Sequence, residues 1–472
     1  MSDLLLYYQR PEPATWVFLS SFLLLGIYFV FHRFFSIRNL DLVLLVLLAP
    51  GLMMVYEGRQ MHAKAETAAA QLNSTVEVAS AEASTTTDDP SNTSQEAVAA
   101  ALSMSQSLEY YGFMALLIAC SLLMTRMLLD CRLHRRPLLV PNLSIGGLSF
   151  LGVSMFVFLM ANVITSSPRE QQLRGPSLGP GYALLNMLPE LPTIPPDKEQ
   201  QALAEDSTTD RDSAGSAGDA ESGRDDSVPI VQAEAPQATD AESSAGSPWL
   251  PNVARSLAIV SNLAILLGIV GIGYWHFDNV QTGIGCAVMY LLLPYTAQMT
   301  GNLQHVVPAA FLVLAMLMYR QPLIAGALLG LAAGLVYYPL FLLPLWISFY
   351  WHRGRARLLT GIGASLALLA GLLLLQGIDA FTTHLRWMFG LWEPRMDGLE
   401  GIWAPGGIPA DYRLPVLVGF ILLSFSFVFW PSRKNLGSLM CNTAAILLAA
   451  QFWHGNGGGL YMAWFLPFTL LT

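Results

Sequence analysis

The sequence predicts an all-α fold, a polytopic bundle of about 13 transmembrane helices (range 11–13) with two long disordered extracytoplasmic loops. Hydrophobic residues make up 54% of the 472 residues and charged residues only 12%. Soluble domains carry about 45–50% and about 25%, so the apolar residues exceed what one globular core can bury. The apolar residues also form uninterrupted runs near the ~20 residues that a helix needs to cross a bilayer. Because these runs do not alternate with polar residues, they exclude a transmembrane β-barrel.

The apolar runs define the predicted spans. They cover residues 14–32, 39–56, 110–130, 143–165, 253–274, 281–298, 304–319, 322–336, 338–351, 357–377, 414–431, 437–453 and 459–472. Within residues 322–351, Pro339 and Pro344 divide the apolar sequence into a helix rich in Ala and Gly and an aromatic segment. The last run reaches Thr472 without a polar tail, so we expect the natural chain to continue.

Polar inserts divide the chain into five parts. Residues 1–56 form a transmembrane hairpin, 57–109 a polar loop, 110–165 a second hairpin, 166–252 an acidic loop, and 253–472 a multi-span core with an outer loop at 377–413. Both long loops are rich in Ala, Ser, Thr, Asp and Glu and poor in aromatic residues. Such segments cannot bury enough apolar area to fold, so we expect them to be largely disordered.

The acidic loop holds the net charge of the protein. Residues 197–242 contain thirteen Asp and Glu but three Lys and Arg, whereas the whole chain has a net charge of −9. The remainder is therefore close to neutral.

Basic residues in the short connections predict the orientation, because loops rich in Lys and Arg stay in the cytoplasm. These residues are His32, Arg33, Arg38, Arg132, His134, Arg135, Arg136, Arg320, Arg353, Arg355, Arg357, Arg433 and Lys434. With thirteen spans they all fall on one side, and the loops 57–109, 166–252 and 377–413 fall on the other. The predicted location is a bacterial cytoplasmic (inner) membrane, with these loops outside.

The outer loop 377–413 combines aromatic, basic and acidic side chains. Those that could bind or act on a substrate are Arg386, Trp387, Trp392, Glu393, Arg395 and Asp397. One interpretation is a belt of interfacial anchors, since tryptophan and arginine both suit the headgroup zone. The other is a site in which arginines bind phosphate, aromatic faces stack on a sugar and a carboxylate acts as a base.

Four further residues at the predicted outer ends of spans are candidates. Gln304 and His305 open one span, and His454 follows another and precedes a glycine run. Polar groups at membrane depth are functional candidates because lipid offers them no partner, although a lone histidine is more often a structural residue. Glu57 closes the second span and is either a helix-end charge or a general base.

Several apolar motifs resemble a known family. They are GNLQH at 301–305, IAGALLGLAAG at 324–334, YYPLFLLP at 337–344 and YMAWFLP at 461–467. This pattern, over about a third of the chain, resembles the polyprenyl-phosphate-dependent C-type (GT-C) membrane glycosyltransferases, in particular the mannosyltransferase-like branch. One departure is Val336, where that family tends to place a lysine before the proline turn.

The resemblance implies a hexosyltransferase that moves a sugar from a polyprenyl phosphate to an acceptor with inversion, on the extracytoplasmic face. Glu57 or Glu393 would be the base, and His305, Arg386 and Arg395 would lie near the phosphate. No organic cofactor or metal-ligand set is predicted, and a divalent cation is left open. Membrane lipid and the lipid-linked sugar are the expected partners, and nucleic acid is not. The alternatives are a lipid flippase or transporter and a non-enzymatic membrane protein.

Overall fold

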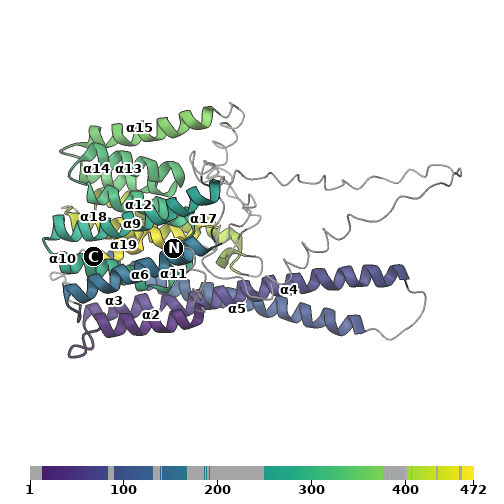
Figure 1. The fold of residues 1–472 in the computed structure, drawn as a ribbon. Helices are drawn as coiled ribbons and strands as arrows, with labels where there is room; N and C mark the ends of the chain where they lie inside the picture. Colours follow the sequence, from purple (N-terminus) through teal and green to yellow (C-terminus); the bar gives the residue numbers. More distant parts are fainter. Residues whose placement is uncertain are drawn as a thin grey trace.

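A computed structural model describes residues 13–82, 90–130, 139, 141–166, 185, 188, 191, 249–375, 378, 382, 399, 401–404, 407–431, 434–455 and 460–472. All regular elements within these residues are helices, as Figure 1 shows. Helices satisfy their own backbone hydrogen bonds, and they are therefore what long apolar runs form in lipid. The predicted all-α class is confirmed.

The helices lie mainly along one direction (Figure 1). Those of the first part of the chain are α2 (Pro13–Tyr28), α3 (Ile37–Val46), α4 (Leu48–Glu82), α5 (Pro90–Asp130) and α6 (Ile145–Thr165). Those of the middle part are α9 (Leu250–Phe277), α10 (Val280–Leu292), α11 (Pro294–Met299), α12 (Leu303–Leu317) and α13 (Pro322–Leu335). The last part contains η1 (Tyr338–Leu342), α14 (Leu343–Phe349), α15 (Arg355–Leu374), η2 (Gly401–Trp403), η3 (Ala410–Tyr412), α17 (Arg413–Phe429), α18 (Leu436–Trp453), η5 (Met462–Trp464) and α19 (Leu466–Leu471).

Seven helical segments within the described residues are long and apolar enough to cross a membrane. Six shorter apolar segments accompany them, among them α2, α10, α12 and α13. Large apolar side chains such as Phe22, Phe150, Phe425 and Phe429 are exposed on the outer faces of the bundle. Exposed apolar surface of this extent suits contact with lipid rather than water, so this is a membrane protein. The prediction that about thirteen segments span the membrane stays a prediction.

Hydrogen bonds tie the helix ends together at two opposite ends of the bundle. At one end, which we call the basic end, the Tyr28 hydroxyl donates to the Gly285 carbonyl at 2.7 Å and Lys434 Nζ donates to Ser348 Oγ at 2.9 Å. At the other, the insert end, Arg255 Nη2 donates to the Ser166 carbonyl at 2.6 Å. Ser166 and Trp249 flank the acidic loop, so this loop joins the bundle at the insert end.

Helix α18 is the centre of the bundle. Of its most apolar stretch, 89% is buried, against 22% for α17. A capping box starts α18: the Ser438 amide donates to Asn435 Oδ1 at 2.8 Å and the Asn435 amide to Ser438 Oγ at 2.9 Å. Such reciprocal bonds satisfy amides that the first helical turn leaves unpaired.

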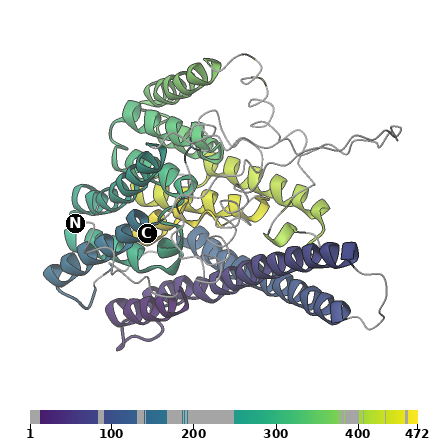
Figure 2. The same ribbon diagram turned by 45° about the vertical axis from the view of Figure 1, so that its right-hand side comes forward.

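Residues 57–109 require a correction, because the predicted disordered loop is helical over 57–82 and 90–109. Helices α4 and α5 form a long antiparallel pair that extends past the other helices in both views (Figures 1 and 2). Alanine, glutamate, glutamine and lysine are strong helix formers, so polarity here does not prevent helix formation. Small residues let the two backbones approach: a Cβ at Gly58 would lie 2.9 Å from the Glu109 nitrogen. Arg59 Nε then reaches Glu109 Oε1 at 3.1 Å.

The acidic loop at 166–252 lies almost entirely outside the described residues. Leu185, Leu188 and Leu191 are the described positions in its interior, and all three are buried against the apolar core. These three leucines therefore pack on the bundle rather than extend into solvent.

Glycines bring α13 and α15 into close contact. A Cβ at Gly326 would lie 2.2 Å from the Leu358 carbonyl oxygen, and one at Gly361 would lie 2.2 Å from the Leu323 carbonyl oxygen. Small residues at a membrane helix interface allow this approach and the van der Waals contact that follows. The predicted division of residues 322–351 at Pro339 and Pro344 is confirmed, since α13 is followed by η1 and α14.

Candidate functional site

Two buried histidines and three buried tyrosines gather at the insert end of the bundle. We call His305, His454, Tyr295, Tyr338 and Tyr461 the histidine cluster. Tyr461 lies between the imidazoles, with its ring centroid 4.5 Å from that of His305 and 4.8 Å from that of His454. Three separate parts of the chain, 295–305, 338 and 454–461, thus meet at one place.

His305 is positioned by the first turn of α12. The side chain of Asn302 caps this helix by accepting from the Gln304 amide at 3.1 Å. The Tyr295 hydroxyl lies 2.5 Å from His305 Nδ1. A hydroxyl bond on one side and a stacked phenol on the other hold the imidazole in one orientation.

His454 stands at the end of a chain of hydroxyl groups. The Tyr337 hydroxyl donates to that of Tyr338 at 3.1 Å, and Tyr338 hydrogen-bonds Nδ1 of His454. If the Tyr338 hydroxyl accepts from Tyr337, it donates to Nδ1, and the proton of the neutral imidazole lies on Nε2. That Nε2 is buried without a hydrogen-bond partner among the described residues. It is a donor available to a ligand.

His454 follows the last residue of α18 and remains neutral at physiological pH. Burial, together with the nearby charge of Arg413, lowers its pKa to about 3. A neutral imidazole can give one hydrogen bond to a ligand without carrying a permanent charge.

Two arginines border the histidine cluster. Arg413 Nε donates to the Trp453 carbonyl at 2.8 Å, and the guanidinium lies over the Trp453 ring. Arg59 on α4 lies within electrostatic reach of His305 and pairs with Glu109. Because Glu109 neutralises Arg59, the positive charge beside the cluster comes from Arg413, and with the neutral donors it suits an anion.

The structure brings together three of the residues predicted from the sequence. His305 and His454 belong to the cluster, and Gln304 adjoins it because its carbonyl accepts from Trp464 Nε1 at 3.4 Å. Trp464 in turn stacks on Tyr461, with ring centroids 4.4 Å apart.

The other predicted residues are placed differently. Glu57 is half-buried on α4, two residues before Arg59 and so about 200° away around the helix axis. The described contacts do not join it to the cluster. The predicted loop residues Arg386, Trp387, Trp392, Glu393, Arg395 and Asp397 lie outside the described residues.

Sequence reasoning missed the tyrosines and the two arginines of this site. Tyr295, Tyr338 and Tyr461 lie within apolar runs, where an aromatic residue is more often part of the core. The available signal was the recurrence of tyrosine at the predicted outer ends of separate spans. Arg59 and Arg413 were visible only as helix-end charges.

An apolar groove begins beside the cluster, at Tyr337, and runs along η1 and α14. It has a volume of about 540 Å³, and Tyr337, Phe341, Ile347, Trp351 and Phe425 are among the residues that line it. Its serines bond across to backbone, Ser424 Oγ to the Phe341 carbonyl at 2.6 Å and Ser348 Oγ to the Val428 carbonyl at 2.9 Å. Because both serine hydroxyls already donate to backbone carbonyls, the wall of the groove is almost wholly apolar.

No group of three or more His, Cys, Asp or Glu side chains able to hold a metal ion occurs within the described ranges. No family model, curated protein or solved structure matches the chain. The functional argument therefore depends on the geometry of this chain.

Proposed function

We propose that this protein is a membrane glycosyltransferase that takes a sugar from a polyprenyl-phosphate donor and transfers it to an acceptor on the extracytoplasmic face of a bacterial cytoplasmic membrane. The observation that carries the proposal is the junction between the apolar groove and the histidine cluster. Tyr337 lines the groove, and its hydroxyl bonds to Tyr338, which contacts His454. A donor with a hydrocarbon tail and a phosphate-linked sugar has the same two-part chemistry.

The groove suits the hydrocarbon tail. The elements beside it, η1 and α14, extend together over about 20 Å, a large part of a hydrocarbon core of about 30 Å. Phe425 and Trp351 border it and are exposed on the outside of the bundle. A prenyl chain would enter from the bilayer and lie against apolar side chains.

The cluster suits the phosphate and the sugar. Arg413 supplies positive charge, and the Nε2 proton of His454 supplies a buried donor. Bonds from charged donors to phosphate oxygens are short and strong, and they strengthen as negative charge develops on a leaving phosphate. The faces of Tyr461 and Trp464 offer stacking surfaces for a pyranose ring.

The reaction would proceed by direct displacement. The acceptor hydroxyl oxygen attacks the anomeric carbon while the bond from that carbon to the phosphate oxygen breaks. A carboxylate takes the hydroxyl proton, and the polyprenyl phosphate leaves with its negative charge bound by Arg413. We assign the base to Glu57 or Glu393.

Purified full-length protein in liposomes tests the proposal when it is given decaprenyl-phosphate carrying radiolabelled mannose or glucose together with acceptors that carry free hydroxyl groups. If the protein transfers the sugar, the radiolabel appears on a product that is no longer attached to the prenyl phosphate. The Arg413→Gln variant should form much less of that product. Arg353→Gln is the matched control, since Arg353 is exposed at the opposite end of the bundle.

The same assay separates the alternatives. A flippase would move the labelled lipid between leaflets with the sugar intact. Full transfer activity in both Glu57→Gln and Glu393→Gln would disprove the assignment of the base.

A further inference from the structure

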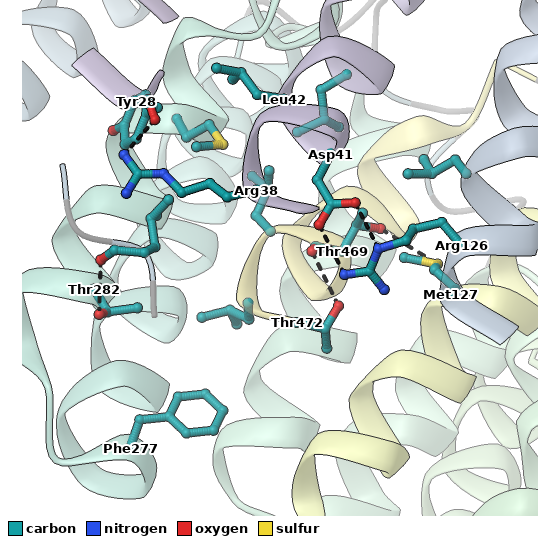
Figure 3. A pocket seen from close by; sticks show the side chains of 16 residues that line it. Tyr28, Arg38, Asp41, Leu42, Arg126, Met127, Phe277, Thr282, Thr469 and Thr472 are labelled. Atoms are coloured by element: carbon teal, nitrogen blue, oxygen red, sulfur yellow. Dashed lines mark hydrogen bonds and ion pairs between the residues drawn. The ribbon is translucent and has the colours of Figure 1, made fainter. Parts of the chain in front are cut away.

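A second cavity lies at the basic end of the bundle, opposite the histidine cluster. Its volume is about 200 Å³, and α3, α5, α10 and α19 contribute to its wall. Figure 3 shows polar side chains on two sides of this cavity, with Tyr28, Arg38 and Thr282 on one and Asp41, Arg126 and Thr472 on the other. The apolar part of the lining consists of leucine, methionine and phenylalanine side chains.

Asp41 and Arg126 neutralise one another. Arg126 Nε lies 2.8 Å from Asp41 Oδ1, and Nη2 donates to Asp41 Oδ2 at 2.9 Å. This two-point contact joins α3 to α5 and holds both side chains in the wall of the cavity. Of the charged side chains that line the cavity, Arg38 alone has no opposite charge paired with it in the described structure.

Arg38 has more donors than partners. Its Nη2 donates to the Tyr28 carbonyl, as Figure 3 shows. Its Nε proton is buried without a partner among the residues that the structure describes. A guanidinium carries five N–H donors, and a charge beside apolar surface is costly unless an anion or further acceptors satisfy it. The protein supplies one carbonyl oxygen to this guanidinium, so its remaining donors, the buried Nε proton among them, are available to an oxygen-rich anion.

Hydroxyl groups stand where such an anion would need neutral donors. Thr282 Oγ1 lies 3.3 Å from the Leu139 carbonyl, a long bond that the hydroxyl can leave by rotation. Thr469 and Thr472 also line the cavity. Their hydroxyls donate to carbonyls of their own segment of the chain, and Thr469 Oγ1 also contacts the sulfur of Met127 on α5 at 4.0 Å. Rotatable hydroxyls and a guanidinium are donors that recur at phosphate sites in proteins.

We propose that this cavity binds a phosphate group, as a phosphomonoester or phosphodiester, through Arg38 and the threonine hydroxyls. The site lies at the end opposite the proposed transfer site and uses none of its residues, so it stands or falls independently of the proposed function. Two sources fit the chemistry: the headgroup of an anionic phospholipid, and a soluble phosphate that enters from the basic side.

Native mass spectrometry and thermal unfolding of the purified full-length protein test the proposal. The protein is compared in phosphatidylcholine nanodiscs, in nanodiscs with added phosphatidylglycerol, and in phosphatidylcholine with added inorganic phosphate. Arg38→Gln should weaken binding at least about tenfold, which corresponds to the loss of about 1.4 kcal/mol. Arg38→Lys should retain part of it. Arg357→Gln removes the same charge from an exposed position at the same end and should leave binding unchanged.

Thr282→Val is a second variant, which removes a hydroxyl but keeps the shape of the side chain. Because it leaves Arg38 in place, it tests the site even if Arg38→Gln does not fold. Retention of phosphatidylglycerol that Arg38→Gln and Thr282→Val both reduce would identify a lipid headgroup site. Stabilisation by inorganic phosphate with the same dependence would identify a soluble ligand. Equal binding by the wild type, Arg38→Gln, Thr282→Val and Arg357→Gln would overturn the proposal.

Discussion

The hydroxyl of Tyr338 hydrogen-bonds Nδ1 of His454 although 116 residues separate the two in sequence. The bond joins η1 to the end of α18, the most buried long helix of the described structure. It also sets which imidazole nitrogen carries the proton, and so which nitrogen faces a ligand. A single phenol thereby links the packing of the bundle to the chemistry at its end.

Tyr338→Phe should weaken the binding of polyprenyl-phosphate-linked sugar by about three- to tenfold, because the imidazole loses the bond that orients it and a neutral hydrogen bond contributes about 0.5–1.5 kcal/mol. Tyr412→Phe is the matched control, since Tyr412 is exposed near the same end. Binding is measured by fluorescence titration with a short-chain analogue in nanodiscs. An equal effect of both variants would contradict the role of Tyr338.

Acid should destabilise the protein through His454. An unfolded histidine has a pKa of about 6.5, whereas burial lowers that of His454 to about 3 in the folded state. The unfolded state therefore binds more protons between these values. The stabilisation is complete above pH ~6.5 and is lost by about 1.4 kcal/mol for each pH unit below it.

His454→Gln should flatten this part of the stability profile between pH 6.5 and pH 4.5, whereas the exposed His352→Gln should not. Thermal unfolding in detergent at several pH values measures the difference. Parallel profiles for the wild type and His454→Gln would show that His454 is not a buried neutral group.

Gly361→Ala should destabilise the contact between α13 and α15. The new Cβ would meet the Leu323 carbonyl oxygen at 2.2 Å and the Ala327 nitrogen at 2.7 Å, and backbone atoms cannot rotate away. We expect a loss of about 1–3 kcal/mol, the usual cost of overpacking. Gly363→Ala, on the same helix with nothing within 4 Å, should be neutral or slightly stabilising. Equal unfolding temperatures for the two variants would contradict the close approach.

Asp41→Asn should cost more stability than the double variant Asp41→Asn with Arg126→Met. The single change leaves the guanidinium of Arg126, which is 14% exposed, without its carboxylate. Leaving such a group unpaired costs about 1–3 kcal/mol or more, while removing both partners costs less. A double-mutant cycle from unfolding in detergent measures the coupling, and additive effects would argue against it.

Backbone amides of residues 57–69 and 95–109 should exchange slowly with deuterium, because they belong to α4 and α5 and the two helices pack against each other. Amides in the core of α18 provide the slow reference. Gly58→Val should increase exchange in both segments, and Gly146→Val, which meets no neighbour within 4 Å, should not. Complete exchange of residues 57–69 within seconds in the wild type would restore the interpretation of a disordered loop.

The helical class and the positions of most apolar segments could be predicted from the sequence, because continuous hydrophobic runs and prolines determine local structure. It failed at residues 57–109, where low hydrophobicity suggested disorder but alanine-rich helices pair through Gly58 and Gly112. It also failed to show the Asp41–Arg126 pair, since the partners are 85 residues apart. Such pairing depends on which helices are neighbours, and composition does not report this.

The candidate site likewise contains residues that the sequence could indicate and residues that it could not. His305, His454 and Gln304 stood out as polar residues beside apolar runs, and the structure brings all three to the insert end. The tyrosines of the histidine cluster carry no such signal, because a buried tyrosine in a membrane helix usually serves packing. Their contribution follows from the meeting of η1, η5 and the ends of α12 and α18 in space.

Helix α4 has 35 residues and α5 has 41, so the two rods measure about 52 Å and about 62 Å at 1.5 Å per residue. A hydrocarbon core takes up only about 30 Å of that length. Part of each helix therefore extends beyond the hydrocarbon core, and the number of residues in the pair sets how far it can extend. Deleting seven residues from each helix would shorten the pair by about 10 Å and nearly preserve the facing surfaces, whereas deleting five would turn them by about 140°. The length of this pair is thus set in whole helical turns, because only such changes keep the two packed faces opposite each other.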